Sequence, residues 1–170
     1  MRKIWLLALA LLVFGLDFFS KSYVHQTIPL AGYIYPYGGI GVFQDFYGIE
    51  FSIVHVINKG AAWGFLASMQ NYLPYLRLLI VGSMLVYLFF FKAKRALQVP
   101  FVLIIAGALG NICDYFLYGH VVDMFHFKFW GYTYPIFNVA DSAIFCGIVW
   151  LMLQSLYKKR AADEHSTLSS

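Results

Sequence analysis

Eight acidic residues occur in this 170-residue chain, and four of them lie within or beside long apolar stretches. These four are Asp17, Asp114, Asp123 and Asp141. A carboxylate inside a bilayer costs at least about 2.5–3.5 kcal/mol, even on the most lenient insertion scale. The four side chains are therefore candidates for function, and polar pairing between helices is the alternative explanation.

The composition of the chain is that of a membrane protein. Apolar residues make up 61% of the chain and charged residues only 12%, whereas an average soluble domain is about 45–50% apolar and about 25% charged. The mean hydropathy is +0.70. These values exclude a soluble enzyme and a disordered tail. The net charge of +4 does not indicate a nucleic-acid partner, because the basic residues punctuate apolar runs instead of forming one polar face.

Four apolar stretches are long enough to cross a bilayer, which requires about 20 residues. The first follows Arg2 and Lys3 and could be mistaken for a signal peptide. It is longer than an h-region of about 7–15 residues and lacks a cleavage site of small residues, so we expect it to be retained. We expect one membrane domain, residues 1–170, with an all-α core of four transmembrane helices. The predicted spans are residues 4–24, 72–91, 99–117 and 138–157.

Basic clusters predict the orientation of these spans. Basic clusters lie before the first span, between the second and third spans, and after the fourth span. With four spans, all three clusters are on the same side of the membrane, and the positive-inside rule predicts that this side is cytoplasmic. Both termini, the loop 92–98 and the tail 158–170 are then cytoplasmic, and we expect residues 161–170 to be frayed. The clusters are Arg2 and Lys3; Lys92, Lys94 and Arg95; and Lys158, Lys159 and Arg160.

Two segments, residues 25–71 and 118–137, are predicted to face outward. The first contains a strand pattern at Phe51–Ile57. We expect it to form a small extracytoplasmic β-sheet that lies at the membrane surface as a cradle, with its aromatic residues in the interfacial belt. The second segment is expected to be a turn-rich loop. The glycines typical of turns are Gly38, Gly39 and Gly41.

The four aspartates are predicted to share one depth near the outer surface. Asp17 lies about 10 Å from the outer end of its span, at 1.5 Å per residue, and the other three lie close to an outer helix end. For Asp17, an internal ion pair with Lys21 and a catalytic role both remain open, whereas Asp114 is expected to support or position the site. The pairs on a common helical face are Asp17 with Lys21, Asn111 with Asp114, and Asn138 with Asp141.

Asp123 and Asp141 are the predicted catalytic pair. They are separated by the second outward segment, which returns the chain to the same surface. Two carboxyl groups at one apolar site cannot both ionise cheaply, so the pair shares a proton. The ionised member can take a proton from water, and the protonated member can stabilise the oxyanion of a scissile amide.

A metal-dependent reaction is not predicted. His120, Asp123 and His126 have three-residue spacing, but the chain has no H-E-x-x-H motif, and these residues do not share one helical face. The other three histidines are scattered along the sequence. We therefore expect no metal ion and no cofactor.

A serine or cysteine nucleophile is not indicated either. Ser142 follows Asp141 but points about 100° away from it on a helix. Cys113 has no evident activating base and is typical of a small core residue. The two cysteines, Cys113 and Cys146, form no disulfide framework.

Five sequence blocks together resemble the bacterial lipoprotein signal peptidases, also called signal peptidase II. They occur in the family's order and at its positions relative to four spans, and the resemblance covers nearly the whole chain. The blocks are Asp17-Phe-Phe-Ser-Lys21, Asn58-Lys-Gly-Ala-Ala-Trp-Gly64, Gly107-Ala-Leu-Gly-Asn-Ile-Cys-Asp114, Val121-Val-Asp123 and Phe137-Asn-Val-Ala-Asp-Ser142.

The resemblance implies an aspartic endopeptidase of the bacterial cytoplasmic (inner) membrane. It would cut diacylglyceryl-modified prolipoproteins before the lipidated cysteine, with membrane lipids as surroundings and with Asp123 and Asp141 as the dyad. It also implies inhibition by globomycin-like compounds, and nothing in the sequence demands more than a monomer. Gly60 and Gly64 would let the backbone approach a substrate closely. The residues that would line or support the site are Asp17, Lys21, Asn58, Asn111, Asp114 and Asn138.

Two positions depart from the family pattern. The family usually has Gln where this chain has Phe18, and Arg where it has Tyr115, so a fixed cation near the dyad is missing from that block. Two other functions are the alternatives. A small multi-pass transporter or proton relay would need carboxylates spread through the membrane, and a non-catalytic scaffold would need no carboxylate pair.

Overall fold

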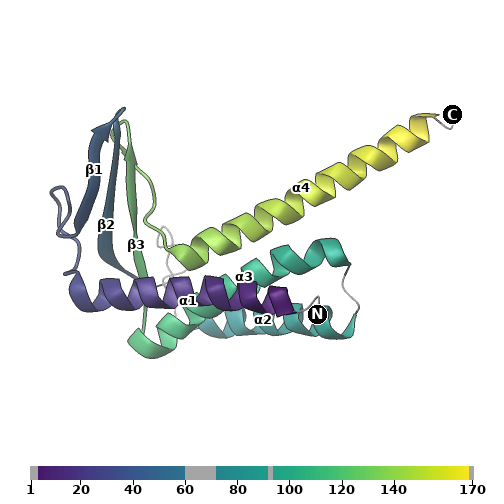
Figure 1. The fold of residues 1–170 in the computed structure, drawn as a ribbon, viewed down its shortest axis with the longest axis horizontal. Coiled ribbons are helices and arrows are strands. Elements are labelled where there is room, and N and C mark those ends of the chain that lie inside the picture. Colours follow the sequence, from purple (N-terminus) through teal and green to yellow (C-terminus); the bar gives the residue numbers. More distant parts are fainter. Residues whose placement is uncertain (1–3, 60–71, 92–93, 169–170) are drawn as a thin grey trace.

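Four long helices form the core of the protein. The computed structural model describes residues 4–59, 72–91 and 94–168 (Figure 1). Each helix contains a stretch apolar and long enough to cross a membrane, so the predicted core of four long apolar helices is confirmed. The helix bounds differ from the prediction at two places: the third helix begins at Arg95, and the fourth continues through the tail expected to be frayed. The helices are α1 (Ile4–Thr27), α2 (Leu73–Phe90), α3 (Arg95–Tyr118) and α4 (Val139–Leu168).

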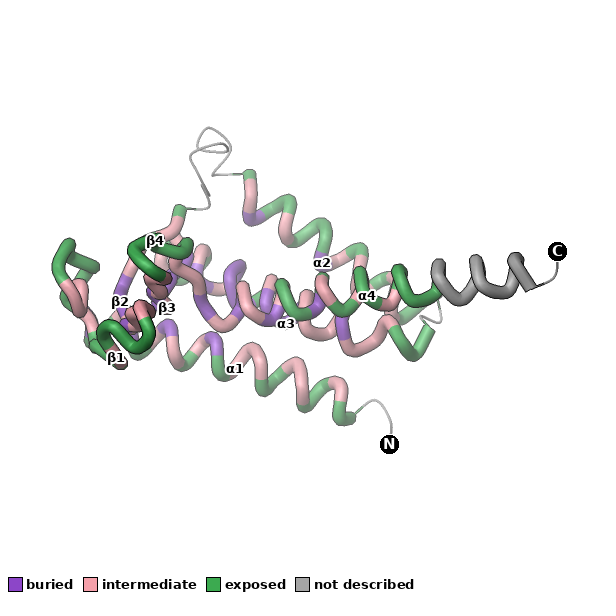
Figure 2. Tube along the Cα trace, turned by 90° about the horizontal axis from the view of Figure 1, so that it is seen from above, coloured by how far each residue is buried: buried purple, intermediate pink, exposed green. Residues whose placement is uncertain are grey.

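Helix α3 lies at the centre of the bundle and contacts the other three helices. Figure 1 shows α4 leaving the other helices toward its C-terminal end, with the sheet at the opposite end of the bundle. Figure 2 shows that buried residues gather along α3 and near the sheet, whereas the outer faces of α2 and α4 are largely exposed.

Burial in α1 is inverted relative to a soluble protein. Leu11 and Phe19 are 62% and 72% exposed, while Asp17 and Lys21 are 0% exposed. Exposed apolar side chains suit contact with lipid, and charged side chains inside a bilayer are stable only when they face partners in the bundle interior. The helices therefore surround a polar centre at the sheet-bearing end.

The sheet has four antiparallel strands in the order β1-β2-β3-β4. The predicted strand Phe51–Ile57 is confirmed and lies within β2. The second outward segment is not the expected turn-rich loop, because it supplies β3 and β4. Its aromatic residues pack on β2, where the rings of Phe51 and Phe127 stack with centroids 4.3 Å apart. The strands are β1 (Ile40–Phe46), β2 (Ile49–Asn58), β3 (Val121–Phe129) and β4 (Tyr132–Thr133).

Two-residue turns close both hairpins. The turn between β1 and β2 has φ of 54° at Tyr47 and 79° at Gly48, and the turn between β3 and β4 has φ of 47° at Trp130 and 85° at Gly131. Positive φ at both positions is the type I′ pattern, which matches the twist of the strands and favours glycine second. Of the glycines predicted to be in turns, Gly41 lies in β1 instead.

Beyond β4 the chain returns beside β3. Phe125 and Phe137 form an antiparallel bridge, with N–H···O distances of 2.8 Å from Phe125 to Phe137 and 3.3 Å in the reverse direction. This bridge lies two residues after Asp123 and one residue before Asn138. It therefore brings the start of α4 to the first half of β3.

Close helix packing fixes α4 against α3. A Cβ atom at Gly107 would meet the carbonyl oxygen of Ala140, and one at Gly110 would meet the carboxylate of Asp17. The small residues of the run Ala106–Gly110 therefore let α3 approach α4 and α1 closely. Larger residues would push the start of α4 away from the polar centre.

We predict that Gly107→Ala lowers the free energy of unfolding by roughly 1–3 kcal/mol, because the added methyl group overpacks a contact with backbone. Gly82→Ala is the matched control, since a methyl group there has nothing within 4 Å. It should be neutral or stabilising by up to about 1 kcal/mol. Circular dichroism in detergent micelles would follow unfolding, and equal stability of the two variants would contradict close packing at Gly107.

Candidate active site

The ammonium group of Lys21 is the centre of the polar network. Its Nζ lies 2.7 Å from Asp17 Oδ2, 3.1 Å from Asp114 Oδ2 and 2.7 Å from Asn111 Oδ1. A lysine ammonium has three N–H donors, so these three acceptors satisfy it completely. The ion pair expected between Asp17 and Lys21 is present, and Asp114 is a second carboxylate on the same cation.

Both carboxylates also hold a neighbouring element. Asp17 Oδ1 accepts the backbone N–H of Ala140 at 2.7 Å, in the first turn of α4. Asp114 Oδ2 accepts the backbone N–H of Val122 at 3.0 Å, at the start of β3. The Lys21 ion pairs therefore position the elements that carry Asp141 and Asp123.

Asn111 connects Lys21 to Asp141. Its Oδ1 accepts from Lys21, which directs its Nδ2–H toward Asp141 Oδ1 at a distance of 2.8 Å. The cation thus fixes the amide orientation, and the amide donates to the carboxylate. Asp141 is half-buried, and a second donor comes from the backbone of Asn138.

Asn138 and Asp141 form a capping box at the start of α4. Asn138 Oδ1 accepts the N–H of Asp141 at 2.9 Å, and Asp141 Oδ2 accepts the N–H of Asn138 at 3.3 Å. This reciprocal pair satisfies backbone donors that the first turn of a helix leaves free. The spacing of an amide and a carboxylate three residues apart before an apolar run is the sequence signal for this arrangement.

Asp123 lies on β3 and shares Asn138 with Asp141. Asn138 Nδ2 donates to Asp123 Oδ1 at 2.7 Å, and Asn58 Nδ2, at the end of β2, donates to Asp123 Oδ2 at 2.9 Å. Burial, and then the nearby charge of Asp141, raise the pKa of Asp123 to about 7, against the lowering effect of the two amide donors. A carboxyl with this pKa can hold a proton at neutral pH.

A cavity of about 670 Å³ opens beside Asp141. Aromatic side chains form much of its wall, and Asn58 and Arg77 also line it. Arg77, on α2, was not predicted as a site residue. Among the described residues that line the cavity, Arg77 is the one with a positive charge. The aromatic lining residues are Phe127, Phe129, Tyr134, Phe137 and Phe145.

The structure joins eight of the predicted site residues in one network. Gly60 and Gly64 lie outside the described residues. Phe18 stacks on Phe14 with ring centroids 6.1 Å apart, and Ser142 Oγ donates to the backbone carbonyl of Asn138 at 3.0 Å. The eight residues are Asp17, Lys21, Asn58, Asn111, Asp114, Asp123, Asn138 and Asp141.

The histidines are arranged differently from the sequence expectation. His126 packs its ring against Tyr37, with centroids 4.3 Å apart. Among the described residues, the histidines that come together are His25, His55 and His120. Sequence reasoning treated His25 and His55 as scattered, because no local motif records that α1 and β2 meet near His120 in the fold.

Solved structures with a similar fold show which class of protein has this architecture. Two bacterial membrane enzymes determined by the in meso method, at 1.9 and 2.3 Å resolution, have similar folds, each with 28% sequence identity to this chain. The first has a TM-score of 0.72 and covers 89% of this chain and 92% of its own. The second has a TM-score of 0.73 with 91% and 88% coverage. The fold is therefore that of a multi-pass bacterial membrane enzyme.

Sequence comparison gives the family. Residues 9–157 match the model of signal peptidase (SPase) II. The lipoprotein signal peptidase of Psychromonas ingrahamii is 35% identical over 166 residues, 95% of this chain and 88% of that protein. The lipoprotein signal peptidase of Burkholderia multivorans is 36% identical over 160 residues, 92% and 90% of the two chains. The chain belongs to the signal peptidase II family of aspartic peptidases.

This family assignment and the site geometry disfavour the alternative of a transporter or proton relay. Such a relay needs carboxylates at several membrane depths. The acidic side chains of the helices that the structure describes within the spans, Asp17, Asp114 and Asp141, belong to one connected network at the sheet-bearing end.

We predict that Lys21→Met lowers the free energy of unfolding by about 3–5 kcal/mol, because it leaves two buried carboxylates without their cation. Asp17→Asn should lower the free energy of unfolding by less, because Asp114 still pairs with Lys21. Its effect on stability should be larger than its effect on turnover per folded molecule. Thermal unfolding and turnover would be measured together.

Lys128→Met is the matched control for this prediction. Lys128 pairs with Glu50 at 3.5 Å, and both side chains are partly exposed, so its loss should change stability by at most about 1 kcal/mol. A fully stable but inactive Asp17→Asn variant would contradict a supporting role for Asp17.

Proposed function

We propose that this enzyme removes the signal peptide from diacylglyceryl-modified prolipoproteins, cutting before the lipidated cysteine, with Asp123 and Asp141 as its catalytic dyad. One observation carries the assignment of the dyad: Asn138 hydrogen-bonds both carboxyl groups beside a cavity. The relatives of this chain are lipoprotein signal peptidases, which supports the substrate class.

The surroundings of the two carboxyl groups support different roles. Asp141 lies in the first turn of α4, where the helix dipole favours negative charge, and it accepts two hydrogen bonds. Asp123 is buried, and with its pKa raised to about 7 a large fraction of this carboxyl stays protonated at neutral pH, unlike an ordinary aspartate. We therefore assign Asp141 as the base and Asp123 as the acid.

The reaction follows from these two protonation states. Asp141 takes a proton from water, the water oxygen bonds to the scissile carbonyl carbon, and Asp123 transfers its proton to the carbonyl oxygen. When the tetrahedral intermediate collapses, Asp123 recovers its proton, Asp141 gives its proton to the departing nitrogen, and the C–N bond breaks. The products are a free carboxyl group and the amino group of the new N-terminus.

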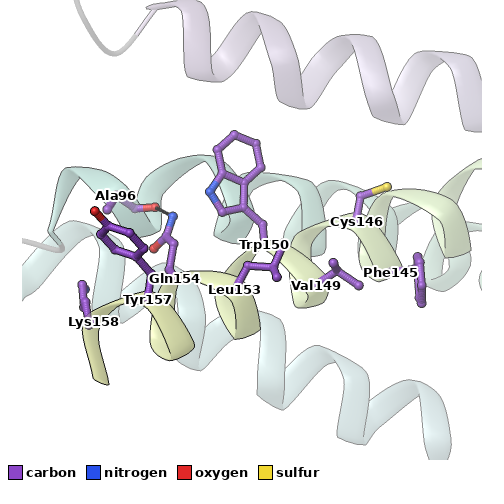
Figure 3. A pocket seen from close by; sticks show the side chains of 9 residues that line it. All are labelled: Ala96, Phe145, Cys146, Val149, Trp150, Leu153, Gln154, Tyr157 and Lys158. Carbon is purple, nitrogen blue, oxygen red and sulfur yellow. Dashed lines mark hydrogen bonds between the residues drawn. The ribbon is translucent and has the colours of Figure 1, made fainter. Parts of the chain in front are cut away.

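The shape of α4 supports a lipid-held substrate. A second cavity, of about 830 Å³, lies between α4 and the start of α3 and is lined mostly by apolar side chains (Figure 3). Phe145 and Cys146 line both this cavity and the one beside Asp141. The two hollows thus form an apolar track along α4 that ends at Asp141, suited to acyl chains or an apolar signal sequence.

The membrane arrangement is part of the same proposal. We assign the enzyme to the cytoplasmic (inner) membrane, with both termini cytoplasmic and the dyad toward the extracytoplasmic face, on the basis of the basic clusters. The sheet would then lie over the substrate at the membrane surface, and residues 1–170 would act as a single-domain monomer. Globomycin-like compounds would compete for the same cavity.

We predict that Asp123→Asn and Asp141→Asn each abolish cleavage of a diacylated lipobox peptide by the purified enzyme, because an amide can neither supply nor accept the shared proton. Asp45→Asn is the matched control, since Asp45 is an exposed carboxylate on β1 with a φ of 55° that Asn also tolerates. It should keep wild-type turnover, and EDTA should change none of the three results. Near wild-type turnover in either dyad variant, with an unchanged melting temperature, would refute the assignment.

We predict that turnover falls as the pH rises through about 7, because Asp123 then loses the proton that it must donate. Native-state stability should fall earlier, as the pH rises from about 4 to about 7, because over this range the folded state holds the proton that the unfolded carboxyl has lost. Asn58→Ala removes a hydrogen-bond donor that lowers the pKa of Asp123. The fall in turnover should therefore occur at a higher pH in this variant. Turnover measured against pH for the wild type and for Asn58→Ala tests this prediction. A fall in turnover at a lower pH in the variant would contradict it.

A further inference from the structure

Three histidines lie together where the C-terminal end of α1 meets the sheet. His25 is in the last turn of α1, His55 is in β2, and His120 precedes β3. One potential ligand atom from each lies within 4.8 Å of the others. The ring centroid of His25 is 5.3 Å from that of His55 and 5.9 Å from that of His120. We call these three residues the histidine cluster.

Each ring of the histidine cluster has a nitrogen that is shielded from solvent and has no hydrogen-bond partner. These atoms are Nδ1 of His25, Nε2 of His55 and Nε2 of His120. His55 is only 6% exposed, so bulk water does not compensate for the missing bond. Buried polar atoms without partners are rare, and three at one place indicate a common ligand.

Backbone contacts hold two rings in the tautomer that a metal ion requires. Nδ1 of His55 lies 2.9 Å from the carbonyl oxygen of Ile28. Because a carbonyl only accepts, this nitrogen carries the proton and Nε2 keeps a lone pair. His120 likewise donates a ring N–H to the carbonyl of Tyr118. Histidines that bind metals almost always donate their other ring N–H to a carbonyl or carboxylate.

The charge around the cluster also suits a cation. The C-terminal end of α1 carries the partial negative charge of the helix dipole next to His25. A bound cation would therefore be attracted by the helix end.

We propose that the histidine cluster binds one divalent transition-metal ion of the Zn²⁺ class. Three neutral imidazoles with an open fourth position form a known ligand set for Zn²⁺, at Zn–N distances of about 2.0–2.1 Å. In a tetrahedral site the nitrogens lie about 3.3 Å apart, so the rings would close by about 1.5 Å. His25 and His120 are half-buried, whereas His55 is buried.

The ion would join α1, β2 and the start of β3. These elements already pack there through a small apolar core of Val24, Ile28, Val122 and Met124. The dyad carboxyl groups bond instead to Asn58, Asn111 and Asn138, so the ion stabilises the position of the sheet and takes no part in cleavage. This inference replaces the sequence expectation of a metal-free chain and is independent of the proposed reaction.

Zn²⁺ titration of the full chain tests the site. The protein is purified without a polyhistidine tag, held in detergent micelles, and followed by isothermal titration calorimetry and thermal unfolding. We expect one equivalent of Zn²⁺ to bind and to raise the melting temperature, and Co²⁺ to give the visible bands of a tetrahedral site. His25→Phe keeps a ring against Tyr118 but removes a ligand, so Zn²⁺ affinity should fall at least about tenfold.

His126→Phe is the matched control. His126 is also buried on β3 and its Nδ1 also has no partner, but it lies outside the cluster, so Zn²⁺ binding should be unchanged. If His25→Phe does not fold in EDTA, His120→Phe is read in its place. Absence of Zn²⁺ binding by the wild type, or equal affinity in the cluster variant, would overturn the proposal. Turnover in EDTA, measured on the same samples, reports separately on the dyad.

Discussion

Burial of one lysine ammonium among three oxygen atoms is the constraint on which the site depends. A charge without partners in an apolar bundle would be very costly, so Lys21 requires Asp17, Asn111 and Asp114 to remain in place. Each of these acceptors has a second bond to another element: Asp17 to α4, Asp114 to β3, and Asn111 to the carboxyl of Asp141. A single cation thereby sets the relative positions of three helices, α1, α3 and α4, and of strand β3.

The same network makes the two carboxyl groups at the cavity unequal. Asp141 is held at a helix start by donors from Asn111 and Asn138, whereas Asp123 is more deeply buried on a strand. Amides, not charges, form the immediate contacts of both carboxyl groups, while the cation lies one step away. This arrangement keeps their charges close enough to interact without neutralising either by an ion pair.

Much of this could be predicted from the sequence, because lipid imposes simple rules. Four apolar stretches give four spans, and helical spacing places Asp17 with Lys21. The contribution of β3 and β4 could not be predicted in the same way, because their pairing with β2 is a long-range contact that local patterns do not record. For the same reason Arg77 and the histidine cluster were missed: their significance depends on which elements meet in space.

The capping box at the start of α4 has a further consequence. The bonds that begin this helix are the same bonds that orient Asn138 and Asp141, so unwinding of a single turn would separate the two carboxyl groups while the rest of the bundle stayed intact. Helix ends open far more readily than helix centres. The capping box, the Asp17 bond to Ala140 and the packing on Gly107 therefore protect the site as well as the helix, because they keep this one turn wound.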